Sequence, residues 1–247
     1  MFHLLRTAAG LLLALPLLGC GSKSENAPGM MPGPGGTLRG PDANYDSTMN
    51  FFVTSRGGPK GGDFRLKDGD TDGLAGADAH CKELAMGVSA ELGAKTWRAY
   101  LSTSTVDARS RIGNGPFYNA QQNIVAENLA QLHEEGGLMN NFVVNDFQNI
   151  LDERGQEVPA DRHAILTGST PAGVKDPDGK TCNNWTSSMG EAAVGHSDRK
   201  GGSGSWNAAG TAGCAPAPMM GADLGNMVAG TVTSGGGRGS VFCFGLR

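Results

Sequence analysis

The sequence lacks several patterns that would assign it to a common functional class. Its formal net charge is −4 and it has no basic stripe, which argues against binding to DNA or RNA. No Cys-x-x-Cys pair occurs, which argues against a zinc ribbon or thioredoxin-like redox chemistry. No Gly-x-Ser-x-Gly elbow occurs, and the five histidines are too widely spaced for two to share one helical turn. We therefore expect a protein that is not an enzyme.

The first twenty residues are typical of a lipoprotein export signal. Arg6 precedes an apolar run from Ala8 to Leu18, which is long enough for a signal sequence and too short to span a bilayer. The run ends in "LLGC", which looks like a bacterial lipobox, and no aspartate follows the cysteine to mark inner-membrane retention. Acyl chains on Cys20 would make a permanent membrane anchor. We predict a signal peptide at residues 1–19, a lipidated Cys20, and an outer-membrane or cell-surface location.

The rest of the chain divides by composition into a tether and one domain. Residues 20–47 are rich in Gly, Pro, Ser and Asn without apolar periodicity, which predicts a flexible tether after the lipidated cysteine. Residues 48–247 are long enough for one domain with a sizeable core. Glycine accounts for 40 of 247 residues and stretches with helical periodicity are few. This composition favours a loop-rich α+β or mostly β domain.

Apolar spacing predicts two helices. Residues 76–88 have one apolar face at helical spacing, made of Ala77, Cys81, Leu84, Ala85 and Val88. Cys81 is therefore expected to point inward. A second, shorter helix is expected around Leu129 and Leu132.

Short strands are expected elsewhere. Runs of β-branched, aromatic or alternating residues predict strands at 49–56, 95–103, 163–170, 180–188, 192–198 and 239–246, and a hairpin that turns at Gln121 and Gln122. The strand at 95–103 is expected to be half buried, since Trp97, Ala99 and Leu101 alternate with Arg98 and Tyr100.

Four cysteines remain besides Cys20, namely Cys81, Cys182, Cys214 and Cys243. An even number in an exported chain predicts two disulfides. The sequence alone allows three pairings.

The order of several short motifs resembles the endostatin-like branch of the C-type lectin-like fold. These motifs are "GADAHC", "TWRAYLS", "TCNNW", "SWNAAGTAGC" and "VFCFG", and the resemblance covers roughly Phe51 to Leu246. It implies an α+β domain over residues 48–247, with two helices packed on short antiparallel strands. It also implies nested disulfides, Cys81 with Cys243 and Cys182 with Cys214.

The resemblance implies binding as the function. A bacterial surface lipoprotein of this plan is expected to be an adhesin that recognises glycans, extracellular matrix or host proteins. The alternative is a structural or interaction lipoprotein that binds another envelope component without lectin activity. The candidate ligand-binding residues are Asn183, Asn184, Trp206 and Asn207, because an indole can stack on a sugar while amides bond its hydroxyls. Trp185 matches a tryptophan at the same spacing in endostatin and is expected in the core.

Calcium has two candidate places in the sequence. The sugar-calcium site of C-type lectins would use a Trp-Asn-Asp triplet, but Ala208 follows Trp206-Asn207, so this site is not expected to operate in its usual form. Asp68, Asp70 and Asp72 occupy positions 1, 3 and 5 of an EF-hand-like loop that lacks the glutamate at position 12. Either Asp78 substitutes for that glutamate, or the segment is a solvated Asp-Gly turn before the first helix. The turn is the favoured interpretation.

Overall fold

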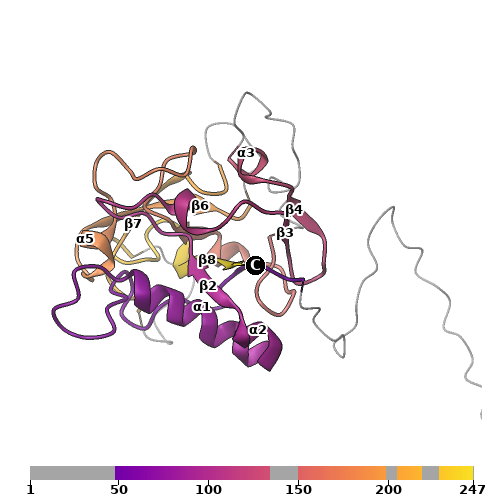
Figure 1. Ribbon diagram of the computed structural model, residues 1–247. Coiled ribbons are helices and arrows are strands. Elements are labelled where there is room, and N and C mark those ends of the chain that lie inside the picture. The colour runs from indigo at the N-terminus through magenta and orange to yellow at the C-terminus, as the bar shows by residue number, and fades with distance from the viewer. Residues whose placement is uncertain (1–47, 134–149, 199–204, 219–227, 247) are drawn as a thin grey trace, which may run out of the picture. The chain divides into compact units, whose positions relative to one another are not determined.

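The computed structural model describes residues 48–133, 150–198, 205–218 and 228–246. It shows an α+β domain with a six-stranded sheet, a separate two-stranded hairpin and short helices around them (Figure 1). The elements in chain order are β1 (Phe51–Val53), α1 (Leu74–Val88), α2 (Ala90–Ala94), β2 (Thr96–Ala99), η1 (Ala108–Arg111), β3 (Phe117–Tyr118), β4 (Ile124–Ala126), α3 (Leu129–Leu132), η4 (Ala160–Arg162), β5 (Ala164–Leu166), α5 (Cys182–Trp185), β6 (Glu191–His196), β7 (Gly210–Gly213) and β8 (Gly237–Leu246). The predicted signal peptide, Cys20 and tether lie outside the described residues.

The last strand, β8, organises the main sheet. Both β1 and β2 pair antiparallel with its second half, one on each side, so that Phe244 has partners in Phe51 and Arg98. The first half of β8 runs parallel to β5, and β6 and β7 follow antiparallel to complete the order β1-β8-β5-β6-β7. The prediction of antiparallel strands is therefore wrong for the β5–β8 pair, and the sheet is mixed. A parallel pair needs a long connection, and residues 167–236 supply it.

Both faces of the sheet are covered. Successive side chains of a strand point to opposite faces. Phe52 and Cys243 therefore join a cluster with α1, whereas Phe51 and Phe244 join a second cluster with the β3–β4 hairpin. In Figure 1, α1 and α2 lie along one side of the strands and the hairpin with α3 lies on another. Since β8 is buried on both sides, it is the centre of the fold.

The predicted helices and hairpin are present. The helix expected at 76–88 is α1, and its buried residues include Ala77, Cys81 and Leu84. The second helix is α3, which is a single turn, and β3 and β4 form the predicted hairpin on either side of Gln122. The prediction that the strand at 95–103 is half buried is wrong at Tyr100. This side chain is fully buried, although it alternates with the buried Leu101 along the chain. β2 ends at Ala99, and the chain beyond it is covered on both sides.

Asp78 joins α1 to two other segments. Its carboxylate accepts hydrogen bonds from the backbone N–H of Ala99 (2.8 Å) and from the guanidinium groups of Arg98 (2.8 Å) and Arg111 (2.9 Å). This carboxylate is fully used in holding the helix to β2 and η1, so it is not available to a metal ion. Among the described helices, none is long and apolar enough to cross a membrane.

Candidate functional site

The segment predicted as a strand at 180–188 forms a left-handed turn instead. Four consecutive non-glycine residues, from Cys182 to Trp185, have φ between 48° and 65°. The turn is closed by backbone hydrogen bonds from Trp185 N to Thr181 O (2.7 Å) and from Thr186 N to Cys182 O (3.1 Å). Left-handed backbone costs about 1–2 kcal/mol per non-glycine residue, so other contacts must hold this turn.

Those contacts come from all sides of the turn. The hydroxyl of Thr181 accepts a hydrogen bond from Asn184 N (3.1 Å), and Cys182 is bonded to Cys214. The indole N–H of Trp185 donates to Ser102 O (2.7 Å), and its ring is fully buried. Trp185 is therefore a core residue, as the sequence predicts.

Only part of the predicted binding surface reaches solvent. Asn183 is exposed, and its amide donates to the hydroxyl of Thr186 (2.9 Å). Asn184 is half-buried, and its side chain bonds both the backbone N–H (2.7 Å) and the hydroxyl (3.1 Å) of Ser104. These two amides, with the hydroxyls at 186–188 beside them, are the polar groups of this turn that reach the surface.

Trp206 and Asn207 are not on that surface, and this corrects their assignment as ligand-binding residues. Trp206 is 1% exposed and Asn207 is fully buried. The Trp206 ring packs 4.9 Å from the rings of Tyr100 and Phe242, and its N–H donates to Leu132 O (2.8 Å). The indole of Trp206 is therefore part of a buried aromatic cluster and is not placed to stack on a sugar ring.

Asn207 belongs to a buried polar network that the sequence does not reveal. Its amide donates to the hydroxyl of Tyr100 (2.9 Å), which also bonds His133 Nε2 (2.7 Å). His133 Nδ1 lies 2.9 Å from Leu129 O, so it carries the ring proton and Nε2 accepts from the tyrosine. Burial raises the pKa of Tyr100 far above its usual value. The network is satisfied internally and closed to solvent, so it suits packing rather than chemistry on a ligand.

The acidic segment before α1 forms turns. Asp70 accepts from the backbone N–H groups of Leu66 and Lys67 (both 3.1 Å), and Asp72 accepts from Leu74 N (3.0 Å). Asp68 is exposed beside them. Within the described ranges, no three His, Cys, Asp or Glu residues are placed to hold a metal ion. With Asp78 engaged elsewhere, the geometry favours the turn over the EF-hand interpretation.

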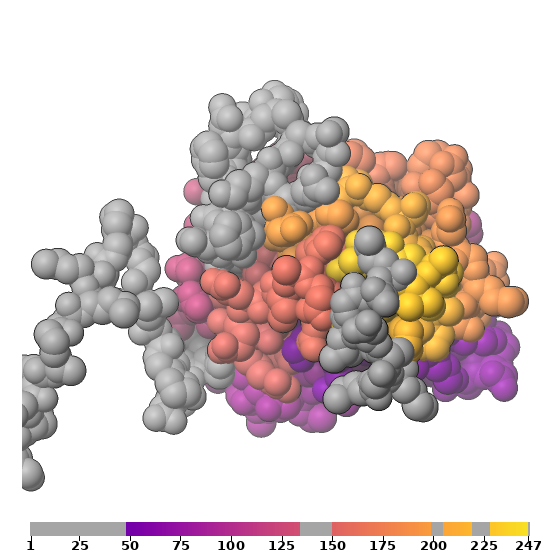
Figure 2. Space-filling model, turned by 180° about the vertical axis from the view of Figure 1, so that it is seen from behind, coloured from indigo at the N-terminus to yellow at the C-terminus, as the bar shows by residue number. Residues whose placement is uncertain are grey.

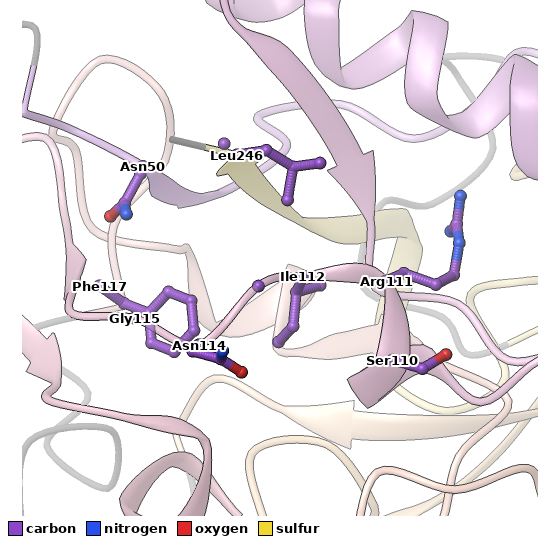
Figure 3. Close-up of a pocket in the computed structure, with 10 residues that line it drawn as sticks. Asn50, Ser110, Arg111, Ile112, Asn114, Gly115, Phe117 and Leu246 are labelled. Carbon is purple, nitrogen blue, oxygen red and sulfur yellow. The ribbon is translucent and has the colours of Figure 1, made fainter.

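Two hollows of about 350 Å³ each mark the surface. The first lies at the end of β8, where Ile112, Phe117 and Leu246 surround it together with Asn50 (Figure 3). The amide of Asn50 is already used, because it accepts from Tyr118 N (2.6 Å) and donates to Pro116 O (2.9 Å). Two other polar side chains of the lining are engaged as well, since Ser110 donates to Asp107 O (2.7 Å) and Arg111 donates to Asp78 (2.9 Å).

The second hollow lies at the other end of β1 and is strongly charged. Its lining includes Arg56, Arg154 and Arg162, together with the carboxylates of Asp152 and Glu157. Residues 54–56 and 152–162 supply these side chains and come together through a parallel bridge between Val53 and Asp152. Sequence reasoning missed this site, because no motif links two segments so far apart.

Comparison of the chain with models of known protein families and with curated proteins found no match.

Proposed function

We propose that this protein is a lipid-anchored, lectin-like binding protein that recognises glycans or extracellular-matrix or host proteins at the bacterial cell surface, without catalysis. The observation that supports this most is the disulfide pairing. Cys81 pairs with Cys243 and Cys182 with Cys214, one loop inside the other. This is the nested arrangement that the resemblance to the endostatin-like branch implies, and it is one of the three pairings that the sequence allows.

The organisation of the polar groups also supports binding over catalysis. Tyr100 and His133 are buried and hydrogen-bonded to each other. By contrast, the charged groups of the second hollow and the amides around Asn183 stand at the surface on a disulfide-bonded scaffold. Polar groups held rigidly at a surface are suited to recognition.

One observation favours the second candidate, an interaction lipoprotein that binds another envelope component. The chain has three tryptophans, and all three are buried: Trp97, Trp185 and Trp206. No indole face is therefore available to stack on a sugar ring. Recognition of a glycan would have to rely on hydrogen bonds and charge.

Glycan and matrix-protein arrays distinguish the two candidates. The full lipidated protein, purified in detergent, is expected to bind a restricted set of glycans or matrix proteins, and the same sample reduced and unfolded serves as control. A flat response from the folded protein would favour the envelope partner.

The anchor is tested separately. Cys20→Ala is expected to move the protein out of the membrane fraction, and globomycin is expected to make the unprocessed precursor accumulate. Retention of the alanine variant in the membrane would contradict lipid anchoring.

A further inference from the structure

The second hollow is formed before any ligand arrives. Val53 N donates to Leu151 O (2.9 Å), and a bridge between Leu151 and Glu157 closes the hairpin that makes one wall. The buried carboxylate of Glu153 accepts from both the backbone N–H (2.9 Å) and the hydroxyl (2.5 Å) of Ser55, which makes the facing wall. The two walls are thus bonded together beneath the opening. Figure 2 shows this side of the molecule, where the salmon segment that contains residues 150–165 lies against the indigo start of the domain.

Arg162 has hydrogen-bonding capacity that the protein leaves unused. One terminal nitrogen, Nη1, donates to Ser55 O (2.5 Å). Its Nε–H is buried and has no hydrogen-bond partner within the described residues. A buried donor without an acceptor is costly, and such a group calls for an explanation. Because this Nε–H is shielded from solvent, the remaining terminal nitrogen is the donor of the guanidinium group that a carboxylate in the hollow would reach.

The neighbouring arginines are less available. Arg56 is paired with Glu83 (2.6 Å), and Arg154 lies 3.7 Å from the carboxylate of Glu153. Arg162 forms no ion pair with any described residue. It is therefore the arginine of this hollow whose charge a ligand would neutralise.

We propose that this hollow binds the carboxylate of one acidic sugar residue, such as a uronic or sialic acid, with Arg162 as its anchor. This inference rests on the proposed function and names the class of glycan. Among the three arginines of the lining, Arg162 is the one whose charge is not paired with a carboxylate of the described residues. One unpaired positive charge suits a single carboxylate, whereas Asp152 and Glu157 would repel a densely sulfated chain.

The size and the other walls of the hollow fit one sugar residue. A volume of about 350 Å³ is near the lower end of the roughly 300–1,000 Å³ range of small-ligand sites. Val158 and Pro159 provide an apolar wall for the C–H face of the ring, and Gln156 provides an amide for its hydroxyls. Burial of Asp152 raises the pKa of its carboxyl group, which weakens its repulsion of an incoming carboxylate as the pH falls.

Titration calorimetry with methyl glycosides tests the assignment on the full lipidated protein in detergent. The probes are the glycosides of glucuronic acid and N-acetylneuraminic acid, with methyl glucoside as the neutral counterpart. Acetate, which has only the carboxylate, and heparin, which is densely sulfated, are titrated for comparison. Arg162→Lys keeps the charge and removes the planar guanidinium group, so binding of the acidic probes is expected to weaken by at least about tenfold. Arg238→Lys is the matched control, because Arg238 pairs with Asp161 outside the hollow and its replacement is expected to leave binding unchanged. Thermal melting of both variants checks that they fold.

Each outcome supports or overturns the inference. Preference for an acidic probe that Arg162→Lys abolishes supports it. Equal binding of neutral and acidic probes, or acidic binding that is untouched in Arg162→Lys, overturns it while leaving glycan recognition intact. Stronger binding of heparin than of the carboxylate probes would also overturn it. If acetate binds in an Arg162-dependent way and no glycoside does, the acidic-sugar assignment fails together with the glycan-binding function.

Discussion

The two disulfides close two regions that are built in different ways. Around Cys81 and Cys243 the structure is regular, with α1 of 15 residues packed on β8 of 10 residues, and with backbone ladders on both sides of β8. Around Cys182 and Cys214 the chain forms a left-handed turn, which is held by side-chain hydrogen bonds and close glycine contacts. In the first region, burial and repeated backbone hydrogen bonds are shared among many residues. The second depends on particular residues at particular positions.

Removal of each disulfide should have the largest effect and should rank the two regions. A disulfide lowers the chain entropy of the unfolded state, and more so when it closes a longer loop. The double variant Cys81→Ala/Cys243→Ala is therefore expected to lose about 5 kcal/mol of unfolding free energy. Cys182→Ala/Cys214→Ala should lose about 3.5 kcal/mol, because its loop is shorter. The sequence separations are 162 and 32 residues. Urea denaturation of both variants measures the difference, and a larger loss from the inner pair would reverse the ranking.

Two glycines near the ends of α1 should respond in opposite directions. A Cβ at Gly73 would lie 2.2 Å from Trp185 O, whereas a Cβ at Gly87 would meet nothing within 4 Å. Gly73→Ala should therefore destabilise by about 1–3 kcal/mol through overpacking against the turn. Gly87→Ala should stabilise the helix by about 0.5–1 kcal/mol. Thermal unfolding compares the pair, and a neutral Gly73→Ala would mean that the turn adjusts freely.

The cost of the left-handed backbone can be measured at Asn183, where φ is 53° and ψ is 56°. Asn183→Ala and Asn183→Gly both lose the hydrogen bond to Thr186, so the difference between them isolates the backbone. The alanine variant should be less stable than the glycine variant by about 1 kcal/mol. Equal stabilities in chemical denaturation would argue against a left-handed residue here.

The smallest effect concerns pH and Asp63, which lies on the loop that reaches the inner disulfide. The hydrogen bond from Arg65 holds the pKa of this carboxyl group below its usual value. A lowered folded-state pKa contributes stability that is present above the unfolded-state value and is lost as the pH falls through the folded-state value. Asp63→Asn should therefore reduce the slope of stability against pH between about pH 5 and pH 2. Parallel curves for both proteins would contradict the role of Arg65.

Sequence reasoning succeeded mainly where structure follows local spacing. The apolar face of α1 predicted both the helix and the inward side chain of Cys81, and the pair Gln121-Gln122 located the hairpin. The disulfide pairing followed from the family resemblance, and it is confirmed. The turn at 182–185 could not be predicted, since four consecutive left-handed residues leave no sign in a segment without glycine.

The candidate site was harder to predict because it depends on contacts between distant segments. Trp206 and Asn207 resemble loop residues in the sequence. In the structure both are buried, and they form hydrogen bonds with Leu132 O and with the hydroxyl of Tyr100. β7, in "GTAG", was missed because its residues have low strand propensity, and its pairing with β6 holds it in the sheet. The hollow around Arg162 joins segments about 100 residues apart, as the Arg162–Ser55 hydrogen bond shows with its separation of 107.

Hydrogen exchange in the Cys182→Ala/Cys214→Ala variant tests the central contrast most directly. Amides of β1 and β8 should keep native-like protection, whereas those of residues 181–187 and β6 should exchange by local opening. The native protein and the Cys81→Ala/Cys243→Ala variant serve as references. If protection in β1 and β8 falls together with that at 181–187, the two regions unfold as one unit and the account is wrong.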